Sequence, residues 1–137
     1  MGIPAGIAAA LRFPDRQVFS IVGDGGALMT GSELATAVAQ KAKIRVIVAN
    51  NNHYGTIRYH QEVHFPTRDH YATNLVNPDF AKYGESFGLK CFTIHNTEEI
   101  LPTIKSAMEV DGPSLIEFKM SLELNTSTTT ISQLQTN

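Results

Sequence analysis

The sequence predicts a single α/β domain with three layers, α-β-α, around a mainly parallel sheet. Two runs rich in β-branched residues, 17–23 and 44–52, are typical of strands that are buried on both faces of such a sheet. Helical patterns alternate with strand patterns along the chain, and this alternation indicates a layered α/β fold. A chain of 137 residues has the size of one ordinary domain.

The first half of the chain predicts a helix followed by a β-α-β unit. Small and aliphatic residues recur at helical spacing from Pro4 to Leu11, and Pro14 interrupts that pattern. The strand at 17–23 comes next. Thr30 and Glu33 then form a capping-box pattern, which predicts the start of a helix before the strand at 44–52.

The second half continues the alternation after a long loop. The predicted elements are a loop at 53–76, a helix at 79–88 capped by Asn77-Pro78, a strand at 89–94, a helix opened by Asn96 with Glu99, and a last strand at 113–120. Residues 125–137 are rich in Ser and Thr and have little to bury. We therefore expect the domain to span 1–124 and a terminal arm or partly disordered tail to follow it.

Composition disfavours several classes of partner. The net charge of −2 and the isoelectric point near 6.2 provide no basic field for nucleic acid or an anionic membrane. No apolar stretch approaches the roughly 20 residues of a membrane span. Cys91 is the single cysteine, so no internal disulfide forms, and the apolar start of the chain lacks a basic leader. These features predict a cytoplasmic protein.

Two polar motifs follow the two best-defined strands. Gly23-Asp24-Gly25-Gly26 ends the first strand, and Asn50-Asn51-Asn52 ends the second. Because the carboxyl ends of parallel strands form the ligand crevice, we expect both motifs to meet there. Amides of Gly25 and Gly26 suit a phosphate, but Asp24 would repel it unless a divalent cation lay between them. Asp24 and Asn51 have the oxygens that Mg²⁺ prefers.

Other phosphate sites fit less well. A dinucleotide-binding fingerprint starting at Gly23 requires Gly or Ala where Leu28 stands, and no P-loop Lys-Ser/Thr follows a glycine loop. The plainer interpretation is that each motif is an ordinary turn. The pair is more specific than either motif alone, since Asp24 and Asn51 are 27 positions apart and each ends a β-branched run.

These residues resemble the thiamine diphosphate-dependent enzymes, whose Gly-Asp-Gly motif is followed, 27 residues after the Asp, by the second Asn of a pair. Segments 1–26, 31–39, 50–62, 77–88 and 112–118 look like the final domain of acetolactate synthase-like members, so the likeness covers nearly the whole chain. The resemblance implies the thiamine diphosphate-binding fold, with thiamine diphosphate and Mg²⁺ as cofactors. It implies that Asp24, the Asn51 side chain and the His53 carbonyl bind the Mg²⁺.

The resemblance also assigns residues to the rest of the site. The implied cofactor-binding positions are Gly23, Gly25, Gly26, Tyr54 and Gly55, beside the metal ligands. The implied substrate-pocket positions are Thr56, Ile57 and His60, the last standing where biosynthetic acetolactate synthases have a Trp. No acid occurs in 54–59, which disfavours the pyruvate decarboxylase-like subclass.

The activity implied by the resemblance is decarboxylation of a 2-oxo acid, with or without joining of the fragment to a second carbonyl. The Glu that activates the cofactor in this family belongs to a pyrimidine-binding domain, usually of a neighbouring subunit. We expect this chain to be a carboxyl-terminal fragment of such an enzyme, a lyase or transferase, and to be inactive alone. The alternative is a non-catalytic binding subunit of a two-chain decarboxylase. Either is expected to form homo-oligomers.

Several other side chains in 53–76 have competing interpretations. The histidines at 53, 60, 64 and 70 crowd this segment, but no Cys or third ligand stands at zinc spacing. Arg58 and Arg68 could hold a substrate acid, although pairing with Glu62 or Asp69 is the favoured role. The apolar residues Ile57, Val63 and Phe65 are expected on an exposed patch that promotes self-association.

Overall fold

A computed structural model describes residues 1–65, 69–123 and 130–135. Arg68 and residues 125–129 and 136–137 of the expected tail lie outside these ranges. The described part contains a four-stranded sheet in the order β1-β2-β4-β3, and every pair of neighbouring strands is parallel. The strands are β1 (Val18–Gly23), β2 (Ile44–Asn50), β3 (Lys90–Ile94) and β4 (Ser114–Lys119). The predicted parallel sheet is confirmed.

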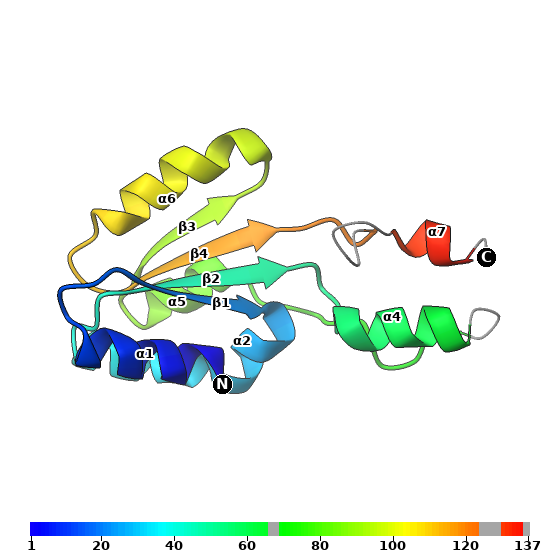
Figure 1. Ribbon diagram of the computed structural model, residues 1–137, viewed down its shortest axis with the longest axis horizontal. Helices are drawn as coiled ribbons and strands as arrows, with labels where there is room; N and C mark the ends of the chain where they lie inside the picture. Colours follow the sequence, from blue (N-terminus) through cyan, green and yellow to red (C-terminus); the bar gives the residue numbers. More distant parts are fainter. Residues whose placement is uncertain (66–68, 124–129, 136–137) are drawn as a thin grey trace.

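Helices cover both faces of the sheet, so the predicted three layers are also confirmed (Figure 1). One face packs against α1 (Gly2–Arg12), α2 (Asp24–Thr30), α3 (Leu34–Ala39) and α5 (Phe80–Ser86). The other face packs against α6 (Ile100–Met108). Phe80, Ile44 and Leu115 are fully buried in the larger core, whereas Ile116 and Ala107 belong to the smaller one under α6.

The strand β1 is buried on one face only, so the expectation of burial on both faces is wrong for it. Ser20 and Val22 are buried toward α1, but Phe19 is 41% exposed and Ile21 is 71% exposed. The cause is that β1 is the edge strand on the side of the sheet away from α6. Among the described residues, α6 covers β3 and β4 and leaves the β1 half of that face open.

The helix after β1 begins earlier than expected. It starts at Asp24 directly after the extended Gly23, and a 3-10 turn at Gly31–Glu33 links it to α3. An acidic residue in the first turn complements the positive end of the helix dipole. Thr30 stands at the N-cap position of this 3-10 turn, but its side chain accepts no helix amide. Its hydroxyl donates to the Gly26 carbonyl at 3.3 Å instead, so the expected capping box is wrong.

The segment 53–76 is not one long loop, because Gly55–His64 form helix α4. Arg58 and Glu62 are ion-paired at 2.7 Å one helical turn apart, a spacing that supports a helix. The next helix, α5, is capped by Asp79 rather than by Asn77-Pro78, since the Asp79 carboxylate accepts the Lys82 amide at 3.0 Å.

The later elements follow the prediction more closely. Asn96 accepts the Glu99 amide at 3.2 Å and caps the turn Thr97–Glu99 ahead of α6, as expected.

In the expected tail, Ile131–Gln135 form helix α7, and Ile131 is buried where α7 meets α4. None of the helices in the described ranges is long and apolar enough to cross a membrane.

Candidate functional site

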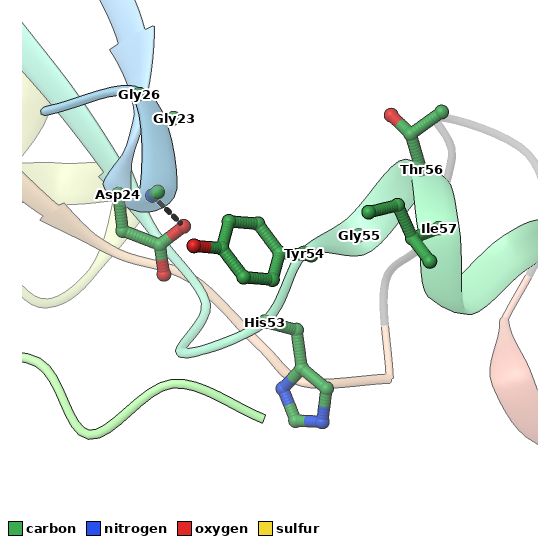
Figure 2. A pocket seen from close by; sticks show the side chains of 9 residues that line it. Gly23, Asp24, Gly26, His53, Tyr54, Gly55, Thr56 and Ile57 are labelled. Atoms are coloured by element: carbon green, nitrogen blue, oxygen red, sulfur yellow. Dashed lines mark hydrogen bonds between the residues drawn. The ribbon is translucent and has the colours of Figure 1, made fainter. Parts of the chain in front are cut away.

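The two polar motifs meet at the carboxyl edge of the sheet, as the sequence predicts. Asp24 follows β1, and the Asn run begins at the end of β2, the neighbouring strand. Asp24, Asn51 and His53 line one hollow of about 240 Å³. An adjoining hollow of about 260 Å³ lies between the start of α2 and the start of α4 (Figure 2). This edge is therefore the candidate site.

The Asp24 carboxylate is buried and held from two sides. The residue is 3% exposed. Its Oδ1 accepts the Gly25 amide at 2.8 Å, and its Oδ2 accepts the Asn77 side-chain amide at 2.8 Å. The Gly25 amide thus donates to Asp24 itself in this structure, rather than toward the hollow. These hydrogen bonds offset the cost of burying the charge.

The glycines around Asp24 provide space rather than a left-handed turn, because none of Gly23, Gly25 and Gly26 has a positive φ. A Cβ atom on Gly23 or Gly26 would meet nothing within 4 Å. A Cβ on Gly25 would lie 2.4 Å from the Tyr54 ring. The open space at Gly23 and Gly26 is what an incoming ligand requires for close approach to the backbone.

The Asn run is folded tightly by its own side chains. The Asn51 Oδ1 accepts the His53 amide at 3.0 Å, and the Asn50 Oδ1 accepts the Asn52 amide at 3.1 Å. Asn52 has φ of 59°, a left-handed conformation that Asn tolerates better than most residues. The His53 carbonyl accepts the Gly55 amide at 2.9 Å and so faces the start of α4.

The residues that follow the Asn run line the second hollow. Tyr54, Gly55, Thr56 and Ile57 are all part of its wall. The Tyr54 ring extends from the chain before α4 toward Asp24, with its hydroxyl leading (Figure 2). His60 is exposed further along α4 and lines neither hollow; its ring stacks on His64 with centroids 5.8 Å apart.

A fourth asparagine, Asn77, belongs to the site and was not predicted from the sequence. The Asn77 Nδ2 lies 2.8 Å from Asp24 Oδ2, 2.8 Å from Asn50 Oδ1 and 3.1 Å from Asn52 Oδ1. Sequence reasoning assigned Asn77 to a helix cap. The signal available was that Asp79, two residues later, is also a capping residue, which leaves Asn77 without that role.

A buried glutamate extends the polar contacts of the site into the sheet. Glu117 on β4 is fully buried, and its Oε1 accepts the Asn50 Nδ2 at 2.6 Å and the Lys119 Nζ at 2.7 Å. The sequence signal was a single acid within the apolar strand 114–118. Such a charge requires partners, and they lie at the carboxyl edge.

The other charged residues of the α4 region pair with one another. Glu62 is fully buried and lies 2.7 Å from both the Arg58 guanidinium and His70 Nε2. This agrees with pairing as the favoured role of Arg58. No group of three or more His, Cys, Asp or Glu side chains that could hold a metal occurs among the residues that the structure describes.

The donor set fits Mg²⁺ with a diphosphate. A hard cation takes oxygen ligands, commonly one or two from protein carboxylates or amides, while phosphate and water complete the shell. Asp24, which has a carboxylate, and Asn51, which has a side-chain amide oxygen, line the same hollow. The open positions at Gly23 and Gly26 leave room beside them. The hydrogen bonds that these oxygens accept leave lone pairs for a cation.

Comparison with known proteins identifies the kind of domain. Residues 1–118 match the family model described as "Thiamine pyrophosphate enzyme, C-terminal TPP binding domain". The chain is 37% identical over 118 residues to a 3D-(3,5/4)-trihydroxycyclohexane-1,2-dione hydrolase of Bacillus subtilis, covering 80% of this chain and 18% of that protein. It is 31% identical over 121 residues to the acetolactate synthase large subunit of Porphyra purpurea, covering 88% and 20%.

A solved structure gives the same result. The thiamine diphosphate-dependent 4-hydroxybenzoylformate decarboxylase of Rhodococcus jostii RHA1 superimposes with a TM-score of 0.81 at 31% identity, covering 88% of this chain and 23% of that chain. The chain thus spans about a fifth of the length of these relatives. The named relatives are a hydrolase, a synthase and a decarboxylase, so the domain is shared by enzymes of different reactions.

Proposed function

This chain belongs to the thiamine pyrophosphate enzymes, as their C-terminal TPP binding domain, and we propose that it binds the diphosphate of the cofactor through Mg²⁺ at the edge formed by β1 and β2. The observation that carries the proposal is the shared hollow of Asp24, Asn51 and His53. In this proposal, the Asp24 carboxylate, the Asn51 Oδ1 and the His53 carbonyl are the protein ligands of Mg²⁺.

The remaining site residues complete the proposed binding of the diphosphate. Gly23 and Gly26 keep open the space that the phosphates require, and the chain at Tyr54 and Gly55 forms the opposite wall. Thr56 and Ile57, exposed on the first turn of α4, are the candidates to face a substrate. His60 remains a candidate only if the pocket extends along α4 in the assembled enzyme.

We further propose that the assembled enzyme acts on a 2-oxo acid by decarboxylation or carboligation. Thiamine diphosphate supplies the carbanion chemistry when it is bound. The role of this domain is to neutralise the diphosphate and to orient the cofactor. The activating Glu is expected from a pyrimidine-binding domain or subunit, and a cytoplasmic homo-oligomer is part of the proposal.

Calorimetry on the full chain with thiamine diphosphate and Mg²⁺ tests the binding role. We expect weak binding that requires both components and that is abolished in Asp24→Ala. Asp15→Ala, which removes an exposed acid in the turn before β1, is the matched control and should bind as the unmodified chain does. Equal affinity in Asp24→Ala would overturn the metal assignment. Release of CO₂ from pyruvate by this chain alone would overturn the proposed division of labour between domains.

A further inference from the structure

The side chain of Asn77 joins the ends of two strands of the sheet. It lies just before α5, far in sequence from both motifs, yet its Nδ2 is within 3.1 Å of oxygens on Asp24, Asn50 and Asn52. Asp24 begins α2 directly after β1, Asn50 is the last residue of β2, and Asn52 lies two residues beyond it. Asn77 therefore links the carboxylate of the candidate site to the Asn run.

The orientation of the Asn77 amide is determined by its neighbours. All three contacts of Nδ2 are to carboxylate or amide oxygens, so the NH₂ group must face them. The Asn77 Oδ1 points the other way, where it is buried without a hydrogen-bond partner among the described residues. A buried acceptor without a partner is costly, which indicates that the contacts of the NH₂ group outweigh that cost.

Asn50 anchors this arrangement to the centre of the sheet. Its Nδ2 donates to Glu117 Oε1 at 2.6 Å, so its Oδ1 must face Asn77. Lys119 donates to the same Glu117 oxygen at 2.7 Å. The contact between Asn77 and Asp24 is thus one end of a chain of hydrogen bonds that reaches fully buried Glu117 on β4.

We propose that Asn77 is a positioning residue of the cation site, which holds Asp24 Oδ2 so that the carboxylate presents a fixed geometry to Mg²⁺. This inference rests on the function proposed above. Gly25 holds the other oxygen, so the carboxylate cannot rotate without losing one of two donors. Mg²⁺ demands nearly ideal octahedral geometry, whereas Ca²⁺ accepts longer and more variable contacts. Fixing Asp24 therefore favours Mg²⁺ over Ca²⁺.

The test is a calorimetric titration of the full chain with Mg²⁺ and, separately, with Ca²⁺, each in the presence of excess thiamine diphosphate. Asn77→Leu keeps a similar volume and removes the donor. We expect about a 10-fold loss of Mg²⁺ affinity, which is typical when a partner of a metal ligand is removed, and a smaller loss for Ca²⁺. Loss of stability alone would lower the affinity of the chain for both cations equally. The ratio of the Mg²⁺ affinity to the Ca²⁺ affinity is therefore the informative quantity.

Asn96→Leu is the matched control, because Asn96 also precedes a helix but lines neither hollow of the site. It should leave the ratio unchanged. If Asn77→Leu does not fold, Asn77→Ser serves in its place. An unchanged ratio, with Asp24-dependent binding intact in the original chain, overturns this inference alone. Binding that does not depend on Asp24 overturns the proposed function as well. Failure of both variants to fold would assign Asn77 to the fold and also overturn the inference.

Discussion

Tyr54 lies so close to Gly25 that a Cβ atom at position 25 would stand 2.4 Å from the Cε1 of its ring. We therefore expect Gly25→Ala to displace the ring and to lower the free energy of unfolding by about 1–3 kcal/mol, the usual cost of overpacking. Urea denaturation measures this loss. Adding Tyr54→Ala should recover part of it, since the two changes act on one contact. Additive losses would contradict the steric explanation.

Gly26→Ala should behave in the opposite way. A Cβ there meets nothing within 4 Å, and alanine is favoured over glycine inside a helix by up to about 1 kcal/mol. The free energy of unfolding should stay constant or rise. Affinity for thiamine diphosphate with Mg²⁺ should fall, because the methyl group takes space that we assign to the diphosphate. Unchanged affinity in calorimetry would argue that the phosphates lie elsewhere.

Arg45 should be one of the most sensitive positions for stability. It is 1% exposed, and its guanidinium donates to the carbonyls of Met108, Val110 and Gly112 at the end of α6 and in the turn after it. Burial lowers the pKa of Arg45 from its usual value. Arg45→Met leaves three carbonyls without their donor, and we expect the free energy of unfolding to fall by about 3 kcal/mol in urea denaturation.

Lys43→Met is the control for Arg45→Met. Lys43 makes an exposed ion pair with Asp111 at 3.4 Å, and such pairs contribute no more than about 1 kcal/mol. Equal losses for the two variants would show that charge, rather than the buried hydrogen bonds, matters at this end of the sheet. Cofactor affinity should not change in either variant, because both positions lie at the start of β2, away from Asn50.

The two capping patterns, Thr30 with Glu33 and Asn96 with Glu99, should respond differently to mutation. Asn96→Ala is expected to lower the free energy of unfolding by about 1 kcal/mol, since Asn96 accepts the Glu99 amide, whereas Thr30→Ala removes no side-chain cap.

Hydrogen bonding by the His95 amide lowers the pKa of Glu99. The stabilisation by Glu99 is therefore present above its unfolded pKa and lost as the pH falls through the lowered one. Thermal unfolding of Glu99→Gln against the original chain should show a difference at pH 7 that shrinks in acid.

The thiol of Cys91 should be unreactive in the folded chain. Burial raises the pKa of Cys91 to about 12, so the reactive thiolate is scarce at pH 8. In the unfolded chain the thiol ionises near pH 8.5, so the raised pKa costs stability progressively from about pH 8.5 to 12. Alkylation by iodoacetamide reports on this residue alone, as the chain has one cysteine. Equal rates with and without urea would contradict the prediction.

The parts of the fold that were predictable depend on local patterns. Short apolar and β-branched runs, separated by segments with helical spacing, predicted the four strands that the described residues form. Each strand has its own β propensity and its own boundary residues, so each can be predicted locally. The exposure of Ile21 was not predictable, since the position of β1 at the sheet edge depends on strand order and not on the strand itself. Helix α4 was not predicted, because it has no apolar stripe. The side chain that it buries is Glu62, which pairs with Arg58 one turn earlier in the same helix.

The site was predictable where sequence spacing implied a shared edge. Asp24 and Asn51 were expected to meet because each ends a strand of the same parallel sheet, and the structure places both in one hollow. Asn77 was not predictable in this way. Its contact with Asp24 spans 53 positions and comes from a segment without regular structure, so no period or propensity indicates it.

Among the described residues, α6 covers the β3 and β4 part of one sheet face and leaves the β1 part of that face uncovered. Phe19 and Ile21 project from β1 on the face that α6 leaves open. Ile57, Val63 and Phe65 are each more than two-fifths exposed in the α4 region, as the sequence suggested. Exposed apolar surface of this kind favours association. We expect the purified chain to sediment as dimers or larger species.

Replacing apolar side chains with charges tests which surface is responsible. Ile21→Lys should shift the chain toward the monomer, because it places a charge on the exposed apolar face of an edge strand, where natural proteins use lysine to block pairing. Leu101→Lys is the control, since Leu101 is 61% exposed on α6, which packs on β3 and β4 and not on β1. If Ile21→Lys has no effect but Phe65→Lys does, association uses the α4 region instead. A monomer in the original chain would contradict the prediction, which rests on the stabilisation gained when either surface is buried against a second copy and apolar area is removed from water.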